Sequence, residues 1–251
     1  MAINLVDVAP WFIGNRNSCS KRSGRRRLKL LLANVNFENT AHGPFIAFVK
    51  RQAPDVLVVQ EANSAWCDSL LSLQSLYPFY QSLPKSGGSG MALYSRFRFQ
   101  QLSIELNEGN ARPSILAKMD FDGVTVSLLS IHPRAPIQKG HFELRNAMFD
   151  SAAECLRKLS GPKIFVGDLN ITPWSHYYRN FAEQTGLTDV RKGFGLLPSW
   201  PTFLLFKWLM IPLDHCLVSN DICVTNVKTG QASGSDHLTL IVELEIQPQA
   251  G

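Results

Sequence analysis

Short apolar runs of strand length alternate along the chain with segments whose apolar residues recur at helical spacing. The runs at 28–35 and 55–60 have strand length, and the segment 44–52 between them has the spacing of one helix face. The clearest helix signal covers 140–159 and stops at Gly161-Pro162, and the apolar run 164–166 follows directly. This order of strand, helix and strand predicts an α/β fold.

The middle of the chain is richer in strands. Residues 115–119 and 124–131 are apolar and flank Asp122-Gly123, a pair that favours a tight hairpin turn. Further elements are expected as short helices at 64–76 and 174–184 and as strands at 91–95, 213–219 and 238–246. We therefore expect two mixed, mostly antiparallel β-sheets packed face to face, with helices outside.

Positive charge is concentrated at the N-terminus. The formal charge of the chain is +5, but residues 1–29 alone carry +6, which leaves −1 for the remaining 222 residues. The basic residues of this segment are Arg16, Lys21, Arg22, Arg25, Arg26, Arg27 and Lys29. We expect a basic arm at 1–27 and one domain at 28–251. The arm either adds salt-sensitive affinity for phosphates or is a solvated linker.

Segments that would direct the chain to a membrane are weak. The longest apolar candidate, 196–212, is interrupted by Pro198, Pro201 and Lys207, and is too irregular to cross a bilayer. The first thirteen residues contain Asp7 and Pro10 and lack a basic leading segment, which argues against a cleavable signal. The default expectation is a soluble, cytoplasmic monomer, and export stays open.

Seven polar residues lie at the ends of predicted strands. They are Asn34, Glu61, His132, Asp168, Asn170, Asp236 and His237. Taken alone, a strand-end Glu is more often a surface residue, an Asn a turn residue and a His a structural residue, so it is their number that indicates a site. Carboxylate and amide oxygens suit a hard cation. Phosphodiester hydrolysis needs an activated water, charge neutralisation on the phosphoryl oxygens and help for the leaving alkoxide. These residues offer groups for each need.

Seven segments of the chain resemble motifs of the endonuclease/exonuclease/phosphatase superfamily and occur in the same order. The segments are 28–35, 54–61 ending in Gln60-Glu61, 90–96, 130–133, Gly167-Asp168-Leu169-Asn170, 212–215 and Gly234-Ser235-Asp236-His237. The resemblance covers about 28–247, and the segment from Gly193 to Asp214 looks most like bacterial members of uncharacterised substrate. It implies a four-layered α/β sandwich whose active site lies where the two sheets open.

The resemblance also implies a role for each matching residue. Glu61, assisted by Asn34 and Asp236, would bind Mg²⁺ or Mn²⁺. Asp168 and Asn170 would hold the attacking water and the phosphate, and His237 would act in acid/base or phosphate-stabilising roles, oriented by Asp214.

Two further positions bear on the substrate. Arg112 resembles the phosphate-contacting Arg of the superfamily, and the alternative is an exposed residue at a strand start. Deoxyribonuclease-like, sphingomyelinase-like and inositol-phosphatase-like members place His at the position of His132, and there we expect it to contact the phosphate and take part in catalysis. Apurinic-site repair enzymes usually place Tyr at this position, so abasic-site repair is disfavoured.

The apolar segment 203–210 lies close before Asp214 and should flank the site. It either packs on the sheet edge as a helix, wedges against bases or dips into a lipid surface. The leading hypothesis is a divalent-metal-dependent endonuclease that acts on DNA, or on RNA, with little sequence preference. The alternatives are a phospholipid (sphingomyelinase-like) or small-molecule phosphohydrolase and, third, an inactive binding module on the same scaffold.

Overall fold

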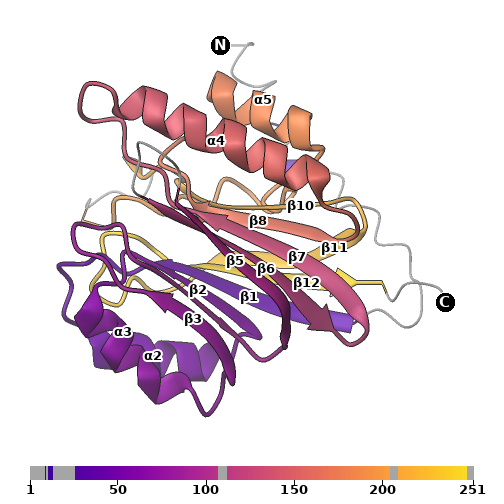
Figure 1. Cartoon of the computed structure of the whole chain (residues 1–251). Coiled ribbons are helices and arrows are strands. Elements are labelled where there is room, and N and C mark those ends of the chain that lie inside the picture. Colours follow the sequence, from indigo (N-terminus) through magenta and orange to yellow (C-terminus); the bar gives the residue numbers. More distant parts are fainter. Residues whose placement is uncertain (1–8, 10, 14–25, 107–111, 204–208, 248–251) are drawn as a thin grey trace.

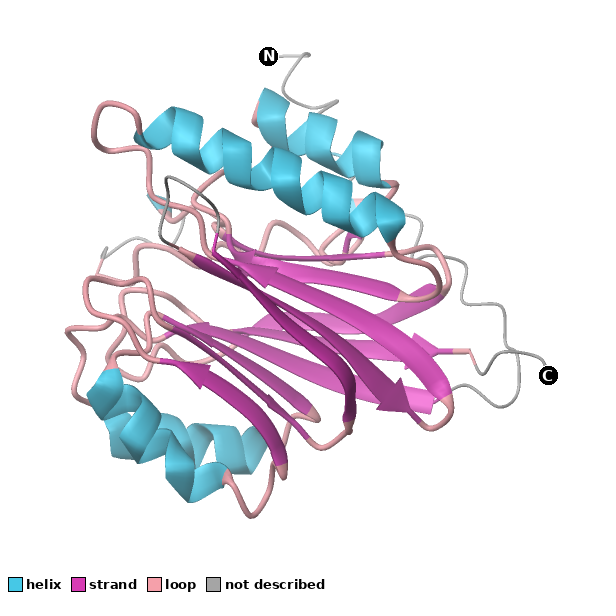
Figure 2. Ribbon diagram, viewed as in Figure 1, coloured by secondary structure: helices cyan, strands magenta, loops and turns pink. Residues whose placement is uncertain are grey.

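Two six-stranded β-sheets pack face to face, and helices cover both outer surfaces (Figure 1, Figure 2). The computed structural model describes residues 9, 11–13, 26–106, 112–203 and 209–247. The predicted α/β sandwich with four layers is confirmed.

The first sheet has the strand order β11-β12-β1-β2-β4-β3, and helices α2 and α3 lie on its outer face (Figure 1). Its strands are β1 (Arg26–Asn34), β2 (Val56–Gln60), β3 (Phe79–Leu83), β4 (Met91–Ser95), β11 (Ile222–Thr229) and β12 (Leu240–Ile246). The helices are α2 (His42–Gln52) and α3 (Ser64–Leu70), and α3 runs into the 3-10 helix η1 (Leu71–Leu73).

The second sheet has the order β5-β6-β7-β8-β10-β9 and is covered by α4 and α5 (Figure 1). Its strands are β5 (Phe99–Leu106), β6 (Pro113–Phe121), β7 (Val124–Ile131), β8 (Lys163–Asp168), β9 (Thr188–Asp189) and β10 (Asp214–Val218). The helices are α4 (His141–Lys158) and α5 (His176–Thr185).

Each sheet is antiparallel except for one central pair of parallel strands. β1 pairs in parallel with β2, and β7 pairs in parallel with β8. Helix α2 connects the first pair and α4 the second, so each sheet contains one β-α-β unit. Because the carboxyl ends of parallel strands meet at the same edge, each unit delivers two strand ends to one place.

Three apolar layers hold the sandwich together, which explains why the central strands are continuously apolar. Leu30 and Leu32 of β1 belong to the cluster between the sheets, whereas Leu31 and Ala33 pack against α2 and α3. A third cluster lies between the second sheet and helices α4 and α5. Strands that are buried on both faces have no polar face to alternate with.

The predicted N-terminal arm is described only in part. Trp11 is buried, and its carbonyl oxygen accepts hydrogen bonds from Gly193 and Gly195 at 3.0 and 2.8 Å. Arg26 and Arg27 begin β1 and form ion pairs with acidic residues. The basic residues 16, 21, 22 and 25 lie outside the described residues, so the arm stays a prediction. No helix in the described part of the chain has the length and apolar character to span a membrane.

Candidate active site

The two β-α-β units bring four polar side chains to one edge of the sandwich. Asn34 ends β1, Glu61 directly follows β2, His132 directly follows β7 and Asp168 ends β8. The backbone of Glu61 is left-handed, with φ of 63°, which is costly for a residue with a side chain. Strain of this kind concentrates at functional sites, where the surrounding structure enforces it.

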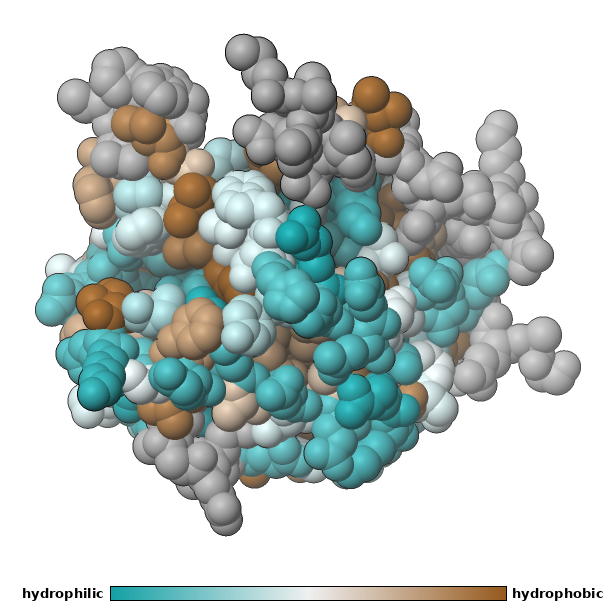
Figure 3. Space-filling model, turned by 90° about the horizontal axis from the view of Figure 1, so that it is seen from above, coloured by the Kyte–Doolittle hydropathy of each residue, from teal (hydrophilic) through white to brown (hydrophobic). Residues whose placement is uncertain are grey.

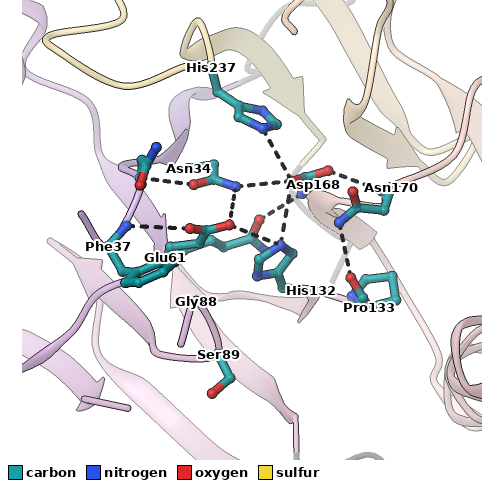
Figure 4. Close-up of polar contacts among 12 residues, drawn as sticks. Asn34, Phe37, Glu61, Gly88, Ser89, His132, Pro133, Asp168, Asn170 and His237 are labelled. Carbon is teal, nitrogen blue, oxygen red and sulfur yellow. Dashed lines mark hydrogen bonds and ion pairs between the residues drawn. The ribbon is translucent and has the colours of Figure 1, made fainter. Parts of the chain in front are cut away.

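The side chain of Asn34 links the two carboxylates at the centre of the cluster. Its Nδ2 donates hydrogen bonds to Oε1 of Glu61 and Oδ2 of Asp168, both at 3.0 Å (Figure 4). The Nε2 atom of His132 lies 3.4 Å from the same Asp168 oxygen and 3.8 Å from Oε1 of Glu61. Residues that are up to 134 positions apart therefore converge from both sheets.

Gln60 fixes the two sheets against each other beside this cluster. Its Nε2 donates to the carbonyl of Ile131 at 2.8 Å, and its Oε1 accepts from the backbone N–H of Asp168 at 2.7 Å. A Cβ on Gly167 would lie 2.0 Å from the Ile131 oxygen, so only glycine permits this approach. The spacing between Glu61 and Asp168 is thereby set by buried bonds.

Arg112 positions the ring of His132. Its Nη1 donates to Nδ1 of His132 at 3.0 Å and to the carbonyl of Gly88 at 3.0 Å. Because arginine only donates, Nδ1 of His132 accepts, and the ring proton sits on Nε2, toward Asp168 and Glu61. Arg112 is 8% exposed and lines the cavity described below, so the alternative of an exposed strand-start residue is wrong.

His237 and Asp214 form a buried pair on the other side of Asp168. The Nδ1 atom of His237 lies 2.8 Å from Oδ2 of Asp214, and its Nε2 lies 3.6 Å from Oδ2 of Asp168. Burial alone would lower the pKa of His237, but the carboxylates of Asp214 and Asp168 outweigh burial and raise this pKa to about 10. Burial would raise the pKa of Asp168, but His237 and His132 hold it well below its usual range. At neutral pH the site therefore contains an ionised Asp168 beside a protonated His237.

The loop that carries Asn170 is held by bonds from several elements. Asn170 has a left-handed backbone, with φ of 49°, and its Nδ2 donates to the carbonyl of Pro133 at 3.1 Å. Arg145 of α4 donates to the carbonyl of Asn170 at 3.2 Å, and His215 lies with Nε2 2.8 Å from the carbonyl of Ile171. These bonds stabilise an Asn170 conformation that an isolated loop would rarely adopt.

A buried ion pair supports His215 from behind. Arg191 is fully buried and donates to both carboxylate oxygens of Asp189, at 3.1 and 2.7 Å, and to Nδ1 of His215. His215 is therefore an acceptor at Nδ1 and donates its Nε2 proton to Ile171. The guanidinium of Arg191 also stacks over the ring of Trp11, 5.4 Å from its centroid.

Asp236 joins the cluster through a neighbouring asparagine. Its Oδ1 accepts from Nδ2 of Asn36 at 3.1 Å, and its Oδ2 accepts from Nε1 of Trp200 at 3.0 Å. The backbone N–H of Asn36 donates to Oδ1 of Asn34 at 3.0 Å. Among the described residues, no three His, Cys, Asp or Glu side chains converge on one ion position. The oxygen donors of Glu61, Asn34 and Asp236 match the chemistry of Mg²⁺, which binds through one or two carboxylates and retains several waters.

A cavity of about 600 Å³ opens over this cluster. Its polar lining residues include Glu61, Arg112, His132, Asp168, Asn170, Asp236 and His237. It is also lined by apolar side chains that include Pro136, Ile137, Phe142, Trp200, Ile211 and Leu213. The volume suits a ligand of nucleotide size that has both charged and apolar groups.

Comparison with known proteins agrees with this architecture. A model of the endonuclease/exonuclease/phosphatase family matches residues 31–237, and no curated protein matches the chain in sequence. The chain belongs to the endonuclease/exonuclease/phosphatase family. Members of this family are hydrolytic enzymes, and the fold is one used by phosphodiesterases and nucleases.

Solved structures share the fold of this family at low sequence identity. D. rerio TDP2, complexed with single strand DNA product, superposes with a TM-score of 0.74 at 16% identity over 87% of this chain and 98% of that chain. Truncated Caenorhabditis elegans TDP2 gives 0.70 at 20% identity, over 87% of this chain and 97% of that chain. A family member from Bacteroides thetaiotaomicron gives 0.67 at 18% identity, over 89% and 99%.

The structure places all nine predicted site residues in or beside one cavity. Asp214 lies behind His237, and Asn34 is covered by its bonds to Glu61 and Asp168, whereas the other seven line the cavity. Of the apolar segment 203–210, Phe203 and Leu209 are exposed and Met210 is buried, while residues 204–208 lie outside the described residues. The residues that the sequence did not indicate are Asn36, Arg145, Asp189, Arg191, Trp200 and His215.

Proposed function

We propose that the protein is a divalent-metal-dependent phosphodiesterase that cuts DNA as an endonuclease with little sequence preference. The observation that carries this proposal is the convergence of Glu61, Asp168 and His237 on one cavity. The single strand DNA product in the D. rerio TDP2 complex supports a nucleic-acid substrate. A basic N-terminal arm would add salt-sensitive affinity for such a polyanion.

The metal of this proposal is Mg²⁺ or Mn²⁺, held by Glu61 with help from Asn34 and Asp236. When bound, such an ion supplies charge neutralisation at the phosphate. The left-handed backbone of Glu61 supports this role, because it holds the carboxylate at the cavity against its own conformational preference.

The roles proposed for Asp168 and His237 depend on their protonation states. The ionised Asp168 accepts a hydrogen bond from the attacking water and orients it toward phosphorus. The protonated His237 donates from Nε2 to a phosphoryl oxygen, and Asp214 holds the ring in that orientation. The Nε2–H of His132, the guanidinium of Arg112 and the amide of Asn170 supply further donors to the phosphate. As the water oxygen bonds to phosphorus, the P–O bond to the leaving group breaks. The water gives up one proton through Asp168 to solvent, and the leaving alkoxide takes up one proton from solvent.

One alternative is a phospholipid phosphodiesterase or small-molecule phosphohydrolase. Two observations favour it: the formal charge of −1 outside residues 1–29, and the exposure of Phe203 and Leu209. Against an inactive binding module stands the complete set of polar strand-end residues, because a module that had lost its activity should have lost at least one of them.

Plasmid nicking and sphingomyelin cleavage, measured side by side with Mg²⁺ and with EDTA, test the three functions. We expect nicking that EDTA abolishes and that the Asp168→Asn variant lacks. Cleavage of sphingomyelin without nicking would establish the lipid alternative. No hydrolysis of any phosphate ester, even with Mn²⁺ supplied, would leave only the binding module.

A further inference from the structure

Two exposed aromatic side chains pack against each other, and one of them, Phe142, lines the cavity. Phe142 lies at the start of α4 and Tyr177 at the start of α5, with ring centroids 5.2 Å apart and an interplanar angle of 84°. Phe142 is 41% exposed and Tyr177 is 40% exposed. Figure 3, which views the face that carries α4 and α5, shows hydrophobic patches among hydrophilic surface, mostly in its left half. The pair thus offers aromatic surface to a ligand next to the catalytic cluster.

A buried cation adjoins this pair. The guanidinium of Arg145 lies over the ring of Phe142, 4.7 Å from the centroid, and both residues line the cavity. Arg145 is 5% exposed, and within the described part of the chain its hydrogen bonds go to the carbonyl of Asn170 and the side-chain oxygen of Asn146, neither of which is charged. A buried arginine without a carboxylate in its bonds favours an anionic ligand nearby.

The surrounding loop has the same sign of charge. Residues 133–146 contain the basic residues Arg134, Lys139 and Arg145 against the single acid Glu143. Aromatic planes interleaved with cations are the features that bind unpaired nucleic acid, because bases stack on the rings and the phosphates follow the cations. A duplex hides the faces of its bases and cannot use such a surface in this way.

We propose that Phe142 and Tyr177, with Arg145, form a stacking platform for the unpaired bases that adjoin the scissile phosphate. The proposal rests on the proposed function and narrows its substrate to single-stranded nucleic acid, or to the single-stranded part of a larger substrate. The platform continues the cavity, because Phe142 and Arg145 line it together with His132 and Asp168. One strand can therefore lie on the platform while its phosphate reaches the catalytic cluster.

Binding measured without hydrolysis tests the platform. The affinity of the full chain for a fluorescent thymidylate oligonucleotide is measured by anisotropy in EDTA, with a duplex of equal length beside it. Tyr177→Ala should raise the Kd for the single strand about 5-fold to 100-fold, the range for loss of one stacked base, and change duplex binding much less. Tyr177→Phe keeps the ring and should stay within about 2-fold of the parent protein.

Tyr80 provides the matched control for removal of an exposed tyrosine. It is also 40% exposed, but lies on β3 at the edge of the first sheet, where it stacks on Tyr94 with centroids 5.5 Å apart. Tyr80→Ala should leave oligonucleotide binding unchanged. A folded Tyr177→Ala protein with unchanged Kd, or an equal loss for single strand and duplex, would overturn the platform. The platform would also be overturned if Tyr177→Ala lost co-sedimentation with phosphatidylserine vesicles while its oligonucleotide affinity was unchanged. That result would assign the surface to lipid.

The two proposals can fail separately. Oligonucleotide binding in EDTA that depends on Tyr177, in a protein that hydrolyses nothing with Mg²⁺ or Mn²⁺, would retain the platform and refute the phosphodiesterase. Where hydrolysis occurs, the ratio of kcat/KM for the oligonucleotide to that for bis(p-nitrophenyl) phosphate should fall with Tyr177→Ala. An unchanged ratio would refute the platform while retaining the enzyme.

Discussion

The Nδ1 atom of His237 lies 2.8 Å from Oδ2 of Asp214, and neither side chain is more than 6% exposed. The pair is asymmetric, because Oδ1 of Asp214 has no hydrogen-bond partner among the described residues. A buried carboxylate with one free oxygen is stabilised mainly by the charge of its partner. The proton on His237 therefore depends on its contact with Asp214.

Replacing Asp214 by Asn should lower the pKa of His237, because it removes the carboxylate that does most to raise it to about 10. In the parent protein, folding retains a proton that the unfolded chain releases near its ordinary pKa of about 6.5. The stabilisation is therefore complete below about 6.5 and is lost as pH rises toward 10. Urea unfolding at pH 6 and pH 9 should show a smaller decline for D214N. NMR titration of metal-free protein that finds equal His237 pKa values in both proteins would contradict this.

Replacing Glu61 by Gln should weaken divalent-metal binding and lower kcat/KM by roughly 100-fold or more, because the amide lacks the charge that holds the ion. Titration of activity with Mg²⁺ measures the shift in half-saturation. Glu38 is exposed and follows Phe37, whose backbone N–H donates to Glu61, so E38Q serves as the control and should titrate like the parent protein. Identical Mg²⁺ curves for E61Q and the parent would refute the metal role of Glu61.

Replacing Arg191 by Met should cost about 3–5 kcal/mol of unfolding free energy, because it leaves the buried carboxylate of Asp189 without its cation. Burial alone would raise the pKa of Asp189, and Arg191 is the main group that holds it far below its usual range. Denaturant unfolding measures the loss. The exposed Lys158–Glu154 pair provides the control, and K158M should have no measurable effect. Equal stability of R191M and K158M would show that Asp189 finds another partner.

Replacing Gly167 by Ala should destabilise the fold by about 1–3 kcal/mol and reduce activity, because the new Cβ would lie 2.0 Å from the backbone oxygen of Ile131. Gly43 in α2 has no atom within 4 Å of the corresponding position. G43A should therefore be neutral or stabilise by up to about 1 kcal/mol. Thermal unfolding of both variants provides the comparison, and a G167A protein as stable and active as its parent would show that the sheets can separate locally.

The central elements could be predicted from sequence because burial on both faces leaves a clear signal. The apolar runs at 28–35, 55–60 and 124–131 correspond to β1, β2 and β7 within two residues at each end. The strands that the pattern missed, β3, β5, β9 and β11, all lie at the ends of their sheets. Edge strands are buried on fewer sides, and β11 also contains an irregularity between Val224 and Asn226, so neither apolar run nor alternation is complete.

The residues of the candidate site that lie at strand ends could be predicted from sequence. Those that join the site through tertiary contacts could not. Asn34, Glu61, His132 and Asp168 each follow an apolar run, so position along the chain identifies them. The contact of Trp200 with Asp236 joins two loops, and that of His215 with Ile171 spans 44 residues. Nothing local distinguishes these residues, because their partners are fixed only by the packing of the second sheet. The helix predicted from Trp174 begins instead at His176, with Ser175 at the N-cap position.

The side-chain amide of Gln60 links β2 to the ends of both β7 and β8 by hydrogen bonds. A displacement of one sheet relative to the other by the length of one hydrogen bond would break both bonds of Gln60. It would also separate the carboxylate of Glu61 from that of Asp168. The rate of turnover should therefore depend on how the apolar side chains between the sheets are packed. Replacements among these side chains, at Leu128 or Val242 for instance, should change the geometry of the site without contacting it.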